Sequence, residues 1–324
     1  MTHSRRTLLA TVAAGLAMPA IARAATWAPN RTIRMIVPYA AGGGADTTAR
    51  LLTNPLSAAL GQTVVVENRG GAGGSIGAGE VARSAPDGHT VMLDALGFVA
   101  TPSLLKVPFD YNTSFTPISQ LTVLPQMMIV PAKSPYNTLP EFLAAAKDHK
   151  SGLVAYGSSG NASAAHLAAV ELLRRANVEL EHVPYRGGGP ALQDLLAGNL
   201  AFVFGTVSSS TQLVRDGQVK ALGITTAKRI PALPNLPTIA EQGFPGYELN
   251  EWNGFYGPAG MAPEVVDAWY KALQTALKDE TVKARLEAMG AIGMGTPPAE
   301  FATFLAAQRK AMGDLIREAG ITAG

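Results

Sequence analysis

The chain has 324 residues, of which 47% are hydrophobic and 15% are charged, and its formal net charge is +2. This length accommodates two domains with hydrophobic cores of their own, and the composition is that of a globular protein rather than a disordered one. Aromatic residues make up 6% of the chain and the basic residues form no stripe, so nucleic-acid binding is not expected. The sequence contains no cysteine, which excludes disulfides, thiol catalysis and thiolate metal sites.

Residues 1–24 have the pattern of a secretory signal peptide. Arg5 and Arg6 precede an apolar stretch over residues 8–20, and Ala22–Ala24 forms a small-x-small cleavage site. The arginine pair resembles a twin-arginine export signal, with an ordinary secretory n-region as the alternative. The apolar stretch is shorter than the ~20 residues that a membrane span needs. Cleavage would remove three of the 26 basic residues and leave 23 against 24 acidic ones, so we expect a periplasmic protein with a net charge of −1.

Beyond this segment, short apolar runs alternate with helical stretches, which predicts an α/β fold with mostly parallel sheets. The expected strands are residues 32–38, 63–67, 90–93, 126–130, 153–156, 179–184, 200–204 and 220–225. Two amphipathic helices are expected near the C-terminus, one starting at Pro263 and one near Pro297, and their apolar faces are interpreted as core.

Two segments have the character of crossovers between lobes. The Pro-rich residues 115–131 lead into a new α/β unit, and the strand 220–225 with the loop 230–237 leads out of it. The expected lobes are therefore lobe 1, residues 26–123 and 228–324, and lobe 2, residues 124–227. Such a discontinuous pair of lobes leaves a cleft in which hinge closure can enclose a ligand.

Three stretches share one plan, in which an apolar strand runs into a glycine-rich turn and then into a helix. The turns are Gly42–Gly44, Gly157–Asn161 and Gly187–Gly189. Each helix start exposes unpaired backbone N–H groups and a partial positive charge, which favour an anion, and glycine allows a ligand to approach the backbone closely. A chain that builds this arrangement three times is expected to bind a small anion rather than to catalyse a reaction.

The first turn supplies one group of candidate binding residues. Gly42, Gly43 and Gly44 are expected to form a carboxylate-facing loop after Tyr39, with a simple tight turn as the alternative. Asp46 is interpreted as an N-cap rather than a ligand contact, because Asp at a helix start satisfies first-turn donors. A carboxylate here would also repel an anionic ligand, unless that ligand has an amino group. Thr47 could donate its hydroxyl to the ligand or cap the helix.

The second and third turns supply the others. Four small polar residues cluster at the second helix start, more than capping requires, and are expected to line the pocket: Ser158, Ser159, Asn161 and Ser163. His166 lies one turn into that helix and is either a structural histidine or part of the pocket wall. Tyr185 ends a strand at the third turn, where its hydroxyl could reach the cleft, and Arg186 could pair with a carboxylate or lie exposed.

Other chemistry has little support. The glycines of residues 70–79 do not fit G-x-G-x-x-G, because Ile76 stands where the last glycine belongs, and no phosphate-binding P-loop motif occurs. The histidines lack metal-ligand spacing, so no metal or cofactor is expected. The main rival is a serine hydrolase that uses a serine near residues 158–163 with His166, but Gly157–Asn161 is not G-x-S-x-G and no orienting acid is evident.

An ordered set of motifs resembles the tripartite tricarboxylate transporter substrate-binding receptors, the Bug-type solute-binding proteins. The motifs lie at residues 33–46, 64–77, 85–90, 182–187, 190–198 and 233–238, and the resemblance runs from about Arg31 to the C-terminus. It implies a periplasmic binding protein of two α/β lobes, of the type II-like kind, joined by two strands. Such a protein is not an enzyme. It captures a small organic carboxylate and delivers it to the membrane permease subunits of a tripartite transporter. The alternative is a ligand-sensing subunit that presents its ligand-bound form to a membrane signalling partner. We expect the protein to be a monomer.

The chain departs from this resemblance at two places that should face the distal part of a ligand. Asp94–Phe98 stands where relatives often have small polar residues, and Gly205–Val207 stands where many carry Asp-Asn. Phe98 and Thr206 are therefore expected to read the far end of the ligand. Neither side chain is charged, so that end is expected to be apolar or aromatic.

Overall fold

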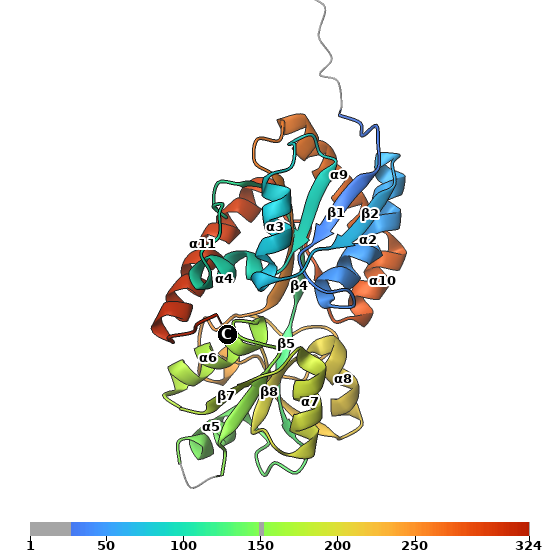
Figure 1. The fold of residues 1–324 in the computed structure, drawn as a ribbon. Helices are drawn as coiled ribbons and strands as arrows, with labels where there is room; N and C mark the ends of the chain where they lie inside the picture. Colours follow the sequence, from blue (N-terminus) through green and yellow to red (C-terminus); the bar gives the residue numbers. More distant parts are fainter. Residues whose placement is uncertain (1–26, 149–151, 324) are drawn as a thin grey trace, which may run out of the picture.

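The computed structural model describes residues 27–148 and 152–323, which form two β-sheets with helices packed on their faces (Figure 1). The predicted signal peptide and its cleavage site lie outside the described residues. The upper half in Figure 1 combines the beginning and the end of the chain, and the lower half contains most of its middle. Within the described ranges no helix is long and apolar enough to cross a membrane.

Sheet A has six strands in the order β11-β4-β10-β3-β1-β2. Its strands are β1 (Ile33–Val37), β2 (Val64–Asn68), β3 (Thr90–Asp94), β4 (Phe115–Leu124), β10 (Glu251–Pro258) and β11 (Ile292–Gly293). One face is covered by α2 (Gly44–Leu60), α9 (Pro263–Lys278) and α10 (Glu280–Ala288), and the other by α3 (Ser75–Ala82), α4 (Gly97–Leu104) and α11 (Pro298–Glu318). The two predicted C-terminal helices correspond to α9 with α10 and to α11, and each buries one apolar stripe in the core.

Sheet B has five strands in the order β7-β6-β8-β5-β9. Its strands are β5 (Gln126–Pro131), β6 (Ala155–Ser158), β7 (Glu181–Pro184), β8 (Phe202–Thr206) and β9 (Val219–Ile224). The helices α5 (Leu139–Ala146) and α6 (Ala164–Ala176) cover one face, and α7 (Gly188–Ala197) and α8 (Val207–Arg215) cover the other.

Both sheets are mixed, so the prediction of mostly parallel sheets is wrong. The pairs β1–β2, β1–β3, β6–β7 and β6–β8 are parallel, as strands joined by helical crossovers should be. The strand β5 enters sheet B from the sheet A half, and β10 enters sheet A from the sheet B half. Both strands run antiparallel to their neighbours. The strands β4 and β10 were not predicted, because Pro117, Gly254 and Gly257 interrupt their apolar patterns.

The chain crosses between the sheets twice. Pro125 alone separates β4 from β5, close to the predicted lobe boundary. The second crossing differs from the prediction, because residues 228–247 pack on the sheet B half before the chain enters β10. Thr238 bridges to Ile224 beside β9, and the Tyr247 hydroxyl donates to the carbonyl of Ala168 on α6 over 2.8 Å. The boundary therefore lies near residue 248 rather than 228, since this Pro-rich segment buries apolar side chains such as Ile230 in the core under sheet B.

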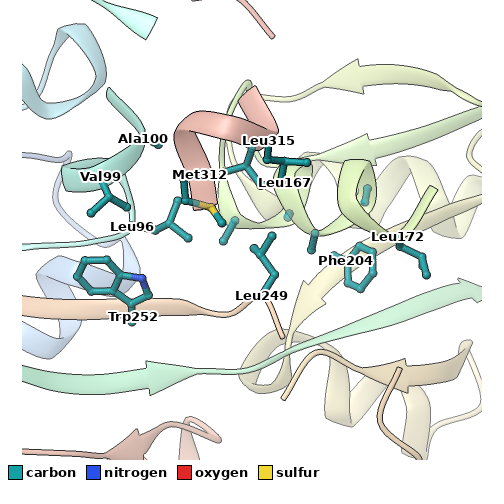
Figure 2. Packing of buried hydrophobic residues seen from close by; sticks show 14 of the residues in the cluster. Leu96, Val99, Ala100, Leu167, Leu172, Phe204, Leu249, Trp252, Met312 and Leu315 are labelled. Atoms are coloured by element: carbon teal, nitrogen blue, oxygen red, sulfur yellow. The ribbon is translucent and has the colours of Figure 1, made fainter. Parts of the chain in front are cut away.

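A third connection is made by side chains rather than by a strand. The end of α11 lies against α6, and Met312 and Leu315 pack between residues of the two halves such as Trp252 and Leu167 (Figure 2). At the rim, Arg174 on α6 forms a 3.6 Å ion pair with Glu318. One continuous hydrophobic cluster thus spans both sheets.

Candidate ligand-binding site

The strand register brings strand ends of the two sheets to face one another. In sheet A, Leu124 at the end of β4 pairs with Glu251 at the start of β10, and β1 and β3 run antiparallel to β10 and so end at this edge. In sheet B, Gln126 at the start of β5 pairs with Thr206 at the end of β8, and β6 and β7 end at the same edge. Because only Pro125 separates β4 from β5, the two edges face each other. The loops that begin α2, α4, α6, α7 and α8 therefore converge, including all three glycine turns.

The loop before α2 presents free backbone donors. Gly42, Gly43 and Gly44 are exposed, and only Gly42 has a positive φ (+86°) that requires glycine. A side chain at Gly44 would meet nothing within 4 Å, and one at Gly43 would meet only the Ala40 carbonyl at 3.6 Å. Neither local conformation nor packing therefore explains the second and third glycines. The first-turn amides of α2 have no carbonyl four residues earlier in the helix to bond, which leaves them available to an anion.

Asp46 holds this loop in shape. Its carboxylate is 3% exposed and accepts from the Gly42 amide at 2.8 Å, Arg50 Nε at 3.0 Å and Asn68 Nδ2 at 2.9 Å. Burial alone would raise the pKa of Asp46, but these hydrogen bonds outweigh it and hold the pKa below its ordinary value. The N-cap itself is Gly43, so Asp46 is not the N-cap that the sequence suggested. Thr47 is half-buried, and its hydroxyl has no hydrogen-bond partner among the described residues.

Tyr39 and Asp94 connect the ends of β1 and β3. The half-buried Tyr39 donates its hydroxyl to Asp94 Oδ1 over 2.6 Å, and the Ala95 amide donates to the same oxygen over 2.7 Å. Burial is the main reason that the pKa of Asp94 rises to about 7, with a contribution from the charge of Glu251. Glu251 Oε1 in turn accepts from the Leu96 amide at 2.9 Å. This acidic pair could not be predicted from the sequence, because only the register of β10 brings Glu251 beside β3.

Phe98 lies in the core rather than in the site. It is 1% exposed, stacks on Tyr256 with ring centroids 4.1 Å apart, and meets Tyr111 and Phe115 edge-on. The guanidinium of Arg309 lies 5.9 Å from its ring centroid. The expectation that Phe98 reads the far end of the ligand does not fit this placement, because the helical turn after β3 directs the ring inward. We therefore leave Phe98 out of the proposed site.

The loop before α6 is built on a pair of histidines. Ser158 is 1% exposed and its Oγ lies 2.7 Å from Nε2 of His182, while the Ala162 amide donates to Nδ1 of His166 over 3.0 Å. The two imidazoles stack with centroids 3.6 Å apart. Burial, with a smaller effect of His182, lowers the pKa of His166 to about 4, and burial also lowers the pKa of His182.

These contacts divide the serine-rich cluster into structural and exposed members. Ser158 bonds inward to the loop and to His182, and Ser163 is the N-cap of α6, accepting from the His166 amide at 3.3 Å. Ser159 and Asn161 are exposed at the edge that faces sheet A and remain available to a ligand. The hydrolase alternative loses its pairing, because His166 bonds to the backbone and the serine that bonds to His182 is buried.

The starts of α7 and α8 complete the edge of sheet B. Tyr185 turns back to donate to Asp194 on α7, so its hydroxyl does not extend toward sheet A as the sequence suggested. Gly188 and Gly189 are exposed with open space around them, and no side chain caps α7. Thr206 caps α8, accepting from the Ser209 amide at 3.3 Å. Its hydroxyl also forms a cluster with those of Ser208 and Ser209, two residues that no motif of the sequence indicated.

Sequence comparison agrees with this architecture. A sequence model of the tripartite tricarboxylate transporter family receptor matches residues 48–321. The chain belongs to this family. No cluster of three or more His, Cys, Asp or Glu side chains that could hold a metal ion occurs in the described ranges.

Solved structures of similar proteins show the same fold. The periplasmic binding protein BugD is 36% identical with a TM-score of 0.77, and the alignment covers 91% of this chain and 99% of BugD. Rpa4515 of R. palustris, solved with adipate, is 31% identical with a TM-score of 0.79 over 91% of this chain and 99% of its own. MatC (Rpa3494) from Rhodopseudomonas palustris, solved with bound malate, is 32% identical with a TM-score of 0.76 over 89% and 99%. This chain therefore has the two-lobe fold of a periplasmic binding protein, as the sequence predicted.

Proposed function

We propose that this receptor captures a small organic carboxylate between the facing edges of its two sheets and delivers it to the membrane subunits of a tripartite tricarboxylate-type transporter. The observation that carries the proposal is the open start of α2. Gly43 and Gly44 are exposed, and neither a positive φ nor close packing requires glycine there. The amides beside them lack intrahelical partners, as an anion-binding loop needs.

The opposite edge supplies further donors. The start of α7 is uncapped and rich in glycine, and Ser159 and Asn161 lie exposed before α6. Thr206 and its neighbouring hydroxyls lie at the start of α8. Of the predicted contacts, we retain Gly42–Gly44, Thr47, Ser159, Asn161 and Thr206 as ligand contacts, and assign Tyr39, Asp46, Ser158, Ser163, His166 and Tyr185 to support of the loops.

Energetics require these donors to act together. A charge at one helix start contributes about 0.3–1 kcal/mol, or up to ~2 kcal/mol when partly buried. A micromolar Kd corresponds to about −8 kcal/mol. No single loop suffices, so the ligand must contact both edges, and closure of the two halves follows because the ligand stabilises the state in which both sets of donors reach it.

Export to the periplasm by the N-terminal signal fits this role, as does the similarity to periplasmic receptors. Adipate and malate, found in two relatives, make organic acids the first ligands to test. The experiment is a thermal-shift screen of the mature protein against organic acids. A ligand that binds only the folded state must raise the melting temperature, so we expect at least one acid to do so. A screen in which only neutral sugars or alcohols stabilise the protein would contradict the proposal.

A further inference from the structure

The start of α4 differs from the open starts of α2 and α7. Asp94 Oδ1 accepts from the Ala95 amide at 2.7 Å, and Glu251 Oε1 accepts from the Leu96 amide at 2.9 Å and from the Trp252 amide at 2.9 Å. The protein's own carboxylates therefore bind the two amides that directly precede this helix. A ligand carboxylate has no place there, although the strand register puts this corner on the same edge as the α2 loop.

Each of these carboxylates keeps one oxygen unused. Among the described residues, Oδ2 of Asp94 and Oε2 of Glu251 have no hydrogen-bond partner. A third polar group points to the same corner, since the Tyr256 hydroxyl is fully buried, has no partner, and lies over Gly254, the residue paired with Asp94 across the sheet. Buried polar atoms are nearly always paired in folded proteins. Of the three groups, the Tyr256 hydroxyl is the fully buried one, whereas Glu251 is half-buried. Together with the two free carboxylate oxygens, this hydroxyl indicates a polar space that is filled by something other than the chain.

No cation among residues 27–148 and 152–323 compensates the two acids. Neither Asp94 nor Glu251 forms an ion pair among the described residues, and the side chains that act on Asp94 are Tyr39 and Glu251. Arg309 approaches the corner but interacts with Tyr256 and Asp110 instead. Burial, and for Asp94 also the charge of Glu251, raises the pKa of both carboxyls, to about 7 for Asp94. A buried carboxylate is costly unless a positive group accompanies it.

We propose that Asp94 and Glu251 recognise a cationic group of the ligand, so that the protein takes a zwitterionic amino carboxylate in preference to a dicarboxylate. This inference rests on the proposed function and specifies its ligand. The carboxylate binds at the uncapped glycine loops, and the ammonium group donates to the free carboxylate oxygens at the start of α4. The two ends of the site are then opposite in charge, as the two ends of such a ligand are.

The test compares amino acids with matched acids by titration calorimetry at pH 7. Each α-amino acid is paired with the acid that lacks only its amino group, such as phenylalanine with 3-phenylpropanoate, leucine with 4-methylpentanoate and glutamate with glutarate. We expect the amino member of the best-binding pair to bind about tenfold or more tightly, as a charge-assisted hydrogen bond in a buried site should provide. Asp94 is partly protonated at this pH, so binding of the ammonium group should also release a fraction of a proton from Asp94. This release is measured as a dependence of the binding heat on the buffer.

Two conservative variants and a control locate the effect. Glu251→Gln and Asp94→Asn keep an oxygen that can accept the amide hydrogen bonds, so both should fold, and each should reduce the preference for the amino member severalfold. Glu248→Gln changes an exposed acid three residues from Glu251 and should leave the preference intact. Equal or tighter binding of the acids without an amino group would overturn the inference and leave the proposed function standing. If no carboxylate of either kind binds, both are overturned.

Discussion

The histidine pair under the α6 loop makes the stability of the protein sensitive to acid. His166 accepts a hydrogen bond from the Ala162 amide through Nδ1, which only the unprotonated nitrogen can do. It also stacks on His182 at 3.6 Å, and two charged rings at this separation would repel each other. Lowering the pH should therefore destabilise the folded state, because the folded protein resists protonation of His166 while the unfolded chain does not.

The sign and size of this change in unfolding free energy follow from the pKa of His166. The folded protein lowers the pKa of His166 from 6.5 to about 4, so the contribution is fully present above pH 6.5 and is lost as the pH falls toward 4. At about 1.4 kcal/mol of unfolding free energy per pH unit, this interval corresponds to at most about 3 kcal/mol. Solvent that reaches part of the histidine pair weakens this electrostatic effect, so we expect a loss of about 2 kcal/mol of unfolding free energy.

The assay is urea unfolding at several pH values for the wild type and for His166→Asn, whose side-chain oxygen can still accept from the Ala162 amide. Other groups titrate over the same range, including Asp94, so the quantity compared is the pH dependence of one protein minus that of the other. We expect the wild type to lose about 2 kcal/mol more than the variant between pH 7.5 and 4.5. Parallel pH profiles for the two proteins would refute the assigned role of His166.

Three further predictions address the loops and the core. Gly44→Val should reduce carboxylate affinity about tenfold or more. It should change the unfolding free energy by less than about 1 kcal/mol, because the new side chain meets only open space in the free protein. Unchanged affinity in calorimetry would remove the α2 loop from the site. Asp46→Ala should lower the unfolding free energy by about 1–3 kcal/mol, as it leaves buried donors unpaired, and urea unfolding checks this. Phe98→Ala should cost about 3–5 kcal/mol in the same assay and weaken long and short acids alike, whereas a selective loss for long acids would return Phe98 to the ligand site.

The strand–turn–helix units could be predicted from the sequence because their signals are local. An apolar run, a glycine turn and a helix start lie within about 20 residues of each other, and α2, α6 and α7 begin within two residues of the predicted positions or within the predicted loop. The antiparallel strands β4 and β10 were harder to predict than β5 and β9. Gly254 and Gly257 in β10 are tolerated because Tyr256, Phe301 and Met261 side chains fill the space above them, which no local pattern reveals.

Side-chain direction was the main limit for the site. Tyr185 and Phe98 stand at strand ends or loops where either orientation is possible, and distant partners decide which one occurs: Asp194 for Tyr185, and Tyr256 for Phe98. Glu251 lies 155 residues from Leu96, to whose amide it bonds, so its place beside α4 depends on the register of β10 alone. Contacts set by sheet register cannot be found from sequence spacing.

The most direct test of carboxylate capture is a calorimetric titration of the mature protein with an organic acid that stabilises it and with the primary amide of the same acid. The pair differs only in the anionic group that the uncapped helix starts are proposed to bind. Carboxylate capture predicts a Kd in the micromolar range for the acid, equivalent to about −8 kcal/mol, and binding at least about a hundredfold weaker for the amide. Equal affinities for the acid and its amide would contradict it.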